Sequence, residues 1–130
     1  MKILYIEDDE NLAVLVCILL KSHGYEVEHY ALGKPGLERF LQISSTWDAV
    51  IIDLDLPDIS GRTLIPEMVA HRPALPIVVY SGLNGPRFGV ENRFQLHIAG
   101  AAAFVWKPSG GQKLLDVLKE LIETPPTSVF

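Results

Sequence analysis

Some features are scarce or missing in this sequence, and each absence excludes a class of protein. Cysteine occurs once, at Cys17, so no intramolecular disulfide can form, and we interpret Cys17 as a small apolar residue of a helix. No apolar run approaches the roughly 18 residues that a membrane span requires. No secretory leader precedes the first predicted strand, because only Met1 and Lys2 come before its apolar residues. We therefore expect a cytoplasmic protein that does not associate with membranes.

Positive charge is also scarce. Lys and Arg number 11 against 16 Asp and Glu, the net charge is −5 at pH 7, and no basic cluster occurs. Because neutralising nucleic-acid phosphates requires such a cluster, we predict no direct nucleic-acid binding by this chain. A composition of 48% hydrophobic and 21% charged residues is that of a folded chain, and 130 residues suit a single domain.

Apolar segments with strand character alternate with segments that carry helix signals. The central run, residues 49–52, is Ala-Val-Ile-Ile and is typical of a strand buried on both faces. Helix signals include Gly24 after the first helix and Ser60 as a cap of the third, whereas Pro66 should kink or delay that third helix. The predicted strands are 2–6, 25–30, 49–52, 77–80 and 104–106, and the predicted helices end near residues 23, 43, 71, 98 and 122.

This alternation predicts an α/β fold. We expect a doubly wound five-stranded parallel sheet with five helices in a single domain, and we take the flavodoxin-like strand order 2-1-3-4-5. The fourth helix, residues 90–98, follows a glycine-rich loop at residues 82–89. Residues 1–123 form the predicted domain, and residues 124–130 are a Pro-rich tail or the start of a linker.

Polar side chains follow the predicted strands at their carboxyl ends. Glu7 and Asp8 follow the first strand, Asp53 follows the third, Ser81 the fourth and Lys107 the fifth. In a parallel sheet of this order these ends share one edge, so the three carboxylates should meet at the switch point. Carboxylates that close repel one another unless they are protonated or bridged by a cation. Because all the candidate ligands are oxygens, Mg²⁺ or Mn²⁺ is favoured over zinc.

Two simpler interpretations compete with the metal site. An Asp-rich helix N-cap without a metal accounts for Asp8 and Asp9 but leaves Asp53 unexplained. Taken singly, Ser81 is an ordinary turn residue and Lys107 an ordinary solvated lysine. Together with a metal-bound carboxylate, however, a hydroxyl and an ammonium form a pocket for a tetrahedral anion, with Asp53 as an oxygen nucleophile toward phosphorus. The combination predicts an aspartyl phosphate.

The chain resembles the receiver domain of two-component response regulators over nearly its whole length. The segments that carry the resemblance are residues 3–10 (ILYIEDDE), 48–61 (DAVIIDLDLPDISG), 76–82 (PIVVYSG) and 100–108 (GAAAFVWKP). The resemblance implies a phosphoacceptor switch and not a conventional enzyme. It implies that a sensor histidine kinase, a phosphotransfer protein or a small acyl phosphate phosphorylates Asp53, and that the domain later hydrolyses this phosphoryl group.

The resemblance also implies roles for individual residues. Glu7, Asp8 and Asp53 would hold Mg²⁺ (or Mn²⁺) together with the backbone carbonyl of Asp55. Ser81 and Lys107 would grip the phosphoryl oxygens, with a cis peptide bond between Lys107 and Pro108.

A conformational switch is implied as well. Ser81 would move toward the phosphoryl group, and Phe104 on the fifth strand would enter the space that it leaves. This change would bias the face made of the fourth helix, fifth strand and fifth helix (α4-β5-α5), where a downstream protein or output domain docks. As a plain alternative, Phe104 is a core residue.

The first helix is apolar almost all round and suggests a further contact. Leu12, Leu15, Val16, Leu19 and Leu20 can face the sheet, which leaves Val14 and Ile18 outside. An outward apolar pair at this spacing suggests an interface with another chain, a homodimer being one option, although single exposed apolar residues are ordinary.

Two other functions remain open. The Asp53–Leu54–Asp55 segment resembles the Asp-x-Asp motif of haloacid-dehalogenase-type phosphatases, with Asp55 as general acid, but that motif normally follows the first strand and requires a cap domain. A pseudo-receiver that acts only as a scaffold is the other alternative, and the intact set of five polar residues is evidence against it.

Overall fold

The computed structural model describes residues 1–42, 46–82, 95, 97 and 99–123. Its five strands form one parallel sheet in the order β2-β1-β3-β4-β5, which confirms the predicted topology. The strands are β1 (Lys2–Ile6), β2 (Glu26–Tyr30), β3 (Ala49–Ile52), β4 (Ile77–Ser81) and β5 (Ala103–Trp106). The helices are α1 (Glu10–Ser22), α2 (Gly33–Gln42), α3 (Gly61–His71), the short 3-10 helix η2 (Lys107–Ser109) and α5 (Gly111–Ile122). The helix expected at residues 90–98 lies mostly outside the described residues.

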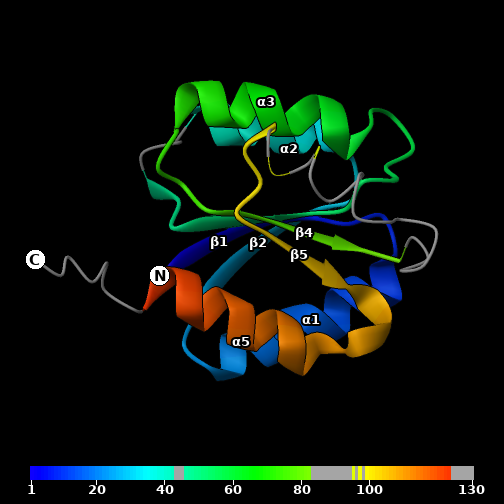
Figure 1. Ribbon diagram of the computed structural model, residues 1–130. Helices are drawn as coiled ribbons and strands as arrows, with labels where there is room; N and C mark the ends of the chain where they lie inside the picture. Colours follow the sequence, from blue (N-terminus) through cyan, green and yellow to red (C-terminus); the bar gives the residue numbers. More distant parts are fainter. Residues whose placement is uncertain (43–45, 83–94, 96, 98, 124–130) are drawn as a thin grey trace, which may run out of the picture.

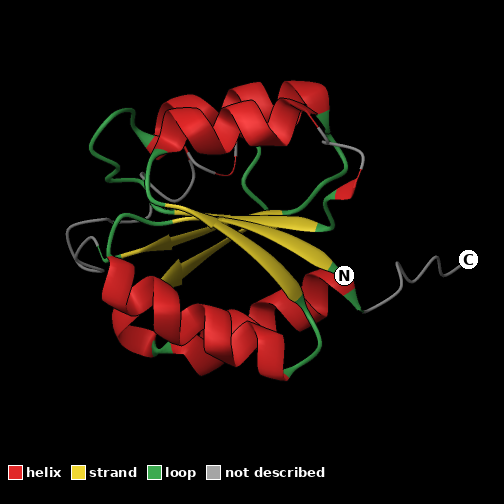
Figure 2. Cartoon of the chain, turned by 180° about the vertical axis from the view of Figure 1, so that it is seen from behind, coloured by secondary structure: helices red, strands yellow, loops and turns green. Residues whose placement is uncertain are grey.

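The helices cover both faces of the sheet. Figures 1 and 2 show α2 and α3 on one face and α1 and α5 on the other. Alternate residues of β1 divide between the two cores: Leu4 and Ile6 pack under α2 and α3, and Ile3 and Tyr5 pack against α1 and α5. Every residue of β3 is buried, as expected for a strand covered on both faces. Among the described residues, no helix combines the length and the apolar character needed to cross a membrane.

Local signals placed the helix ends well. Asp9 caps α1 by accepting a hydrogen bond from the Leu12 N–H (3.1 Å), and Ser60 caps α3 by accepting one from the Arg62 N–H (3.2 Å). Gly24 follows α1 with a φ of +89°, a conformation that favours glycine.

Two expectations were wrong, and a third was wrong in part. Helix α3 begins at Gly61, directly after its cap Ser60, so Pro66 does not delay its start, whereas the kink expected at Pro66 stays a prediction. Leu15 is 65% exposed instead of facing the sheet, because Ala13, Val16 and Leu20 form the buried face of α1. The peptide bond between Lys107 and Pro108 is not cis, and Pro108 lies in the first turn of η2.

Candidate functional site

The polar residues at the strand ends meet at one edge of the sheet. The register pairs Ile6 of β1 with Ile52 of β3, so the next residues, Glu7 and Asp53, leave the sheet side by side. The Asp53 N–H donates to the carbonyl of Ile6 (3.1 Å), which continues the β1–β3 pairing as far as the site. Parallel pairing of the carboxyl ends is therefore what brings together acids 46 positions apart in the sequence.

Glu7, Asp8 and Asp53 form an acidic cluster. One carboxylate oxygen of each residue lies within 4.8 Å of those of the other two. Glu7 is 0% exposed and Asp53 is 4% exposed, whereas Asp8 is open to solvent. A set of carboxylate oxygens with one open side fits a hard divalent cation such as Mg²⁺, which retains several water ligands. The predicted convergence of the three carboxylates is thus present.

Lys107 neutralises part of this negative charge. Its ammonium nitrogen lies 2.8 Å from Asp53 Oδ2 and 2.9 Å from Glu7 Oε1. One ammonium among three carboxylates leaves two formal negative charges, the amount that a divalent cation would neutralise. The side chain of Lys107 keeps 19% exposure, so the site is open toward solvent on the lysine side as well.

Burial controls the protonation of the site. It raises the pKa of Glu7 to about 7, and the charge of Asp53 adds to this rise while the hydrogen bond from Lys107 opposes it. Burial also disfavours the charged form of Lys107, but its hydrogen bonds to Asp53 and Glu7 outweigh this effect and raise the pKa of the ammonium. Lys107 is therefore charged at neutral pH.

The backbone around Asp53 is tightly packed. The Asp55 N–H donates to Asp53 Oδ1 (3.2 Å), so the carboxylate has partners on both oxygens. The first residue of α3, Gly61, donates its N–H to the carbonyl of Leu54 (3.0 Å), and a Cβ at this position would collide with the carbonyl oxygen of Asp53. Only glycine fits here, and its close approach fixes the segment that carries Asp53.

The remaining predicted residues divide between the site and other surfaces. Ser81 is fully buried at the end of β4, paired in register with Trp106 of β5, the residue before Lys107. Phe104 lies two residues earlier on β5 and is half-buried against the core under α2 and α3. The side chain of Asp55 is exposed.

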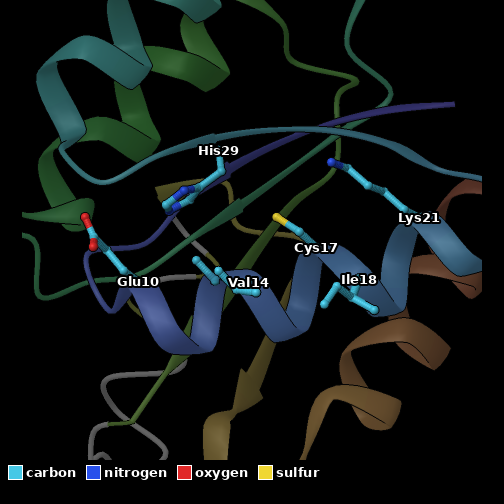
Figure 3. A pocket seen from close by; sticks show the side chains of 7 residues that line it. Glu10, Val14, Cys17, Ile18, Lys21 and His29 are labelled. Atoms are coloured by element: carbon cyan, nitrogen blue, oxygen red, sulfur yellow. The ribbon is translucent and has the colours of Figure 1, made fainter.

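The outward face of α1 lies next to a hollow. Val14 and Ile18 are 57% and 61% exposed, as expected, and Leu15 joins them. The hollow, about 440 Å³, lies between α1 and β2, and Figure 3 shows His29 on its strand side. Its lining residues are Glu10, Ala13, Val14, Cys17, Ile18, Lys21 and His29.

Sequence reasoning missed two residues that contact Glu7. His29 Nε2 lies 2.7 Å from the carbonyl oxygen of Glu7, and the Tyr5 hydroxyl lies 3.5 Å from Glu7 Oε1. Tyr5 was visible as a strand residue two positions before Glu7. The approach of His29 depends on the register between β1 and β2, which the sequence does not reveal.

Comparisons with known proteins agree with this architecture. The family model described as response regulator receiver domain matches residues 3–119. The response regulator ArlR of Staphylococcus saprophyticus is 30% identical over 125 residues, which are 96% of this chain and 54% of ArlR. The chain thus spans about half the length of this curated relative.

Solved structures give the same result. A CheY-like response regulator receiver domain protein from Methanospirillum hungatei JF-1 superposes with a TM-score of 0.84 at 28% identity, covering 94% of this chain and 93% of that one. A BeF3-activated DrrB receiver domain gives a TM-score of 0.78 at 27% identity, with 95% and 97% covered. The five-stranded fold, the acidic edge and the family match together show that this chain belongs to the response regulator receiver domains of two-component systems.

Proposed function

We propose that this domain accepts a phosphoryl group on Asp53 and acts as a phosphorylation switch. The observation that carries the proposal is the position of the Lys107 ammonium, 2.8 Å from Asp53 Oδ2 and beside the acidic cluster. A lysine and a divalent cation on either side of one carboxylate can neutralise the equatorial oxygens of a transferring phosphoryl group.

In the proposed reaction, an Asp53 carboxylate oxygen forms a bond to phosphorus as the bond to the donor breaks. The donor is a phosphohistidine of a sensor kinase or phosphotransfer protein, or a small acyl phosphate, and it leaves with its bonding electron pair. Mg²⁺, held by Glu7, Asp8, Asp53 and the carbonyl of Asp55, would supply charge neutralisation for the phosphoryl oxygens. Lys107 and Ser81 would bind those oxygens, and attack of water on phosphorus would later release inorganic phosphate and restore Asp53.

The downstream signal would come from a structural change at the same edge of the sheet. We propose that Ser81 binds the phosphoryl group and that Phe104 repacks on β5 in response. Part of the face that would carry this signal lies outside the described residues. We also propose that residues 124–130 lead into an output domain or that a separate downstream protein reads the switch.

Mass spectrometry tests the proposed phosphorylation directly. Incubation with Mg²⁺ and acetyl phosphate should add the mass of one phosphoryl group, and chelation of Mg²⁺ or Asp53→Asn should abolish the addition. Asp116→Asn is a matched control, because Asp116 is an exposed carboxylate of α5 that hydrogen-bonds Gln112 (2.9 Å) away from the site. An unmodified wild-type protein would favour the scaffold alternative.

The phosphatase alternative has less support. The match to the receiver family covers residues 3–119, and the Asp53–Asp55 pair follows the third strand of the sheet. Steady turnover of para-nitrophenyl phosphate would revive that alternative, whereas we expect none above the rate of the Asp53→Asn variant.

A further inference from the structure

Both backbone polar groups of Glu7, its N–H and its carbonyl, contact residues of the edge strand β2. Its N–H donates to the carbonyl of Tyr30 (2.9 Å), and its carbonyl oxygen lies 2.7 Å from His29 Nε2. Because a carbonyl oxygen can only accept, Nε2 of His29 must carry the proton and donate it. A side chain thus supplies the last bond between β2 and the residue that begins the acidic cluster.

Tyr5 contacts both the His29 ring and the carboxylate of Glu7. The Tyr5 ring is fully buried, and its centroid lies 5.5 Å from that of His29 with the planes tilted by 50°. Its hydroxyl lies 3.5 Å from Glu7 Oε1, a long contact, and the Asp9 N–H lies 3.3 Å from Oε2. The ring of Tyr5 therefore packs against the side chain that holds the Glu7 backbone, while its hydroxyl faces the Glu7 carboxylate.

A glutamate needs such support more than an aspartate does. Its side chain has one more rotatable bond, so fixing the carboxylate for a cation costs more conformational entropy. Partners that orient a ligand before the metal arrives reduce this cost, and removing them typically weakens metal binding about 10- to 100-fold. His29, which contacts the Glu7 backbone, and Tyr5, which contacts one Glu7 carboxylate oxygen, fit this role.

We propose that Tyr5 and His29 are positioning residues that pre-organise Glu7 for divalent cations. The inference rests on the proposed function, in which Glu7 is a metal ligand. His29 fixes the start of the loop that carries Glu7 and Asp8, and Tyr5 orients the Glu7 carboxylate. His29 also lines the hollow beside α1, where it lies across from the helix (Figure 3).

Three substitutions separate positioning from simple packing. His29→Phe keeps a ring beside Tyr5 but removes the donor. His29→Gln loses the ring but keeps an N–H donor the same number of bonds from the backbone. Tyr5→Phe removes only the hydroxyl. His71→Phe is the matched control, because His71 Nδ1 also contacts a carbonyl, that of Glu67 (3.0 Å), at an exposed site on α3.

The experiment is a Mg²⁺ titration of tryptophan fluorescence without any phosphoryl donor, with thermal melting in chelator to verify folding. We expect His29→Phe and Tyr5→Phe to weaken Mg²⁺ binding, the first by about tenfold and the second less because its contact is long. His29→Gln and His71→Phe should bind within about twofold of wild type. Recovery by glutamine is a result that a purely packing role of the ring would not produce.

Each other outcome has a defined meaning. Wild-type Mg²⁺ affinity in His29→Phe and in Tyr5→Phe would overturn the positioning role and leave the proposed function intact. Equal losses in His29→Phe and His29→Gln would also overturn it, because the ring and not the donor would then matter. Failure of the wild-type protein to bind Mg²⁺ would overturn the inference together with the proposed metal site. If His29→Phe fails to fold, Tyr5→Phe carries the test: weaker Mg²⁺ binding supports the positioning role, and wild-type affinity overturns it.

Discussion

Lys107 is the residue on which the charge balance of the site depends. It places one positive charge between two carboxylates that are almost completely buried, Glu7 and Asp53, with separations of 2.9 and 2.8 Å. Two buried negative charges without a cation would repel each other across a low-dielectric site. The lysine therefore stabilises the fold of the metal-free protein in addition to its proposed contact with the phosphoryl group.

Removal of this ammonium should destabilise the protein in a metal-dependent way. Breaking a fully buried ion pair costs about 3–5 kcal/mol. Because Lys107 keeps 19% exposure and Glu7 can take up a proton, we expect Lys107→Met to lower the free energy of unfolding by about 2 kcal/mol in chelator. In saturating Mg²⁺ the loss should be smaller, since the cation supplies the missing positive charge.

Urea unfolding with and without Mg²⁺ measures this difference. Lys113→Met is the control, because Lys113 is an exposed lysine of α5, and it should change stability little under either condition. An equal loss for Lys107→Met in chelator and in Mg²⁺ would contradict the proposed charge balance.

At the level of secondary-structure elements, the first residue of α3 packs closely against the backbone that follows β3. Gly61 leaves no room for a Cβ beside the Asp53 carbonyl oxygen. We expect Gly61→Ala to cost about 2 kcal/mol of stability, because backbone must shift to relieve the overlap. The same shift should displace Asp53 and slow its phosphorylation by acetyl phosphate.

Gly111 offers a matched comparison for this substitution. It is the first residue of α5, and within the described part of the chain a Cβ there would meet only the Leu19 side chain, at 3.0 Å. Gly111→Ala should therefore change stability and phosphorylation much less than Gly61→Ala, as measured by urea unfolding and by the rate of mass addition. Equal effects of the two alanines would show that the fit around Asp53 is not special.

The edge strand β2 is linked to α2 by an ion pair. Glu28 accepts hydrogen bonds from Arg39 Nε (2.8 Å) and Nη2 (2.9 Å), and the Lys2 ammonium lies 3.4 Å away. The bond from Arg39 is the main reason that the pKa of Glu28 is lowered to about 2, and Lys2 adds to the effect. Because the pKa is below its ordinary value of 4.5, the ionised carboxylate stabilises the fold above about pH 4.5.

This contribution should disappear as the pH falls from 4.5 toward 2. We expect Glu28→Gln to cost about 1 kcal/mol at pH 7, since the side chain is 30% exposed and solvent screens the pair. The difference between wild type and variant should shrink through that window, as measured by urea unfolding at a series of pH values. A difference that stays constant down to pH 2 would contradict the assignment.

For the molecule as a whole, the convergence of acids was predicted well, because it follows from a parallel sheet once the flavodoxin-like strand order is taken, and the structure confirms that order. Buried strands that end in polar residues place those residues at one edge, so Glu7 and Asp53 could be paired without knowledge of distances. The orientation of α1 was harder: its residues are apolar all round, so periodicity could not decide that Leu15 faces outward. The contact of His29 with Glu7 depends on strand register and side-chain reach, which periodicity does not encode.

The exposed apolar face of α1 is where we expect a protein partner to matter. Val14, Leu15 and Ile18 are each more than half exposed, next to the hollow beside β2. If a phosphohistidine donor buries this face during transfer, Ile18→Ser should slow phosphorylation by the protein donor about tenfold, a loss typical of removing one buried apolar side chain from an interface. Phosphorylation by acetyl phosphate needs no such contact and should keep its wild-type rate.

The control is Leu41→Ser, at a 40% exposed leucine of α2 on the other side of the sheet, which should leave both rates unchanged. Loss of both reactions in Ile18→Ser would mean that the substitution damages the fold, whereas a wild-type rate with the protein donor would exclude this face from the contact.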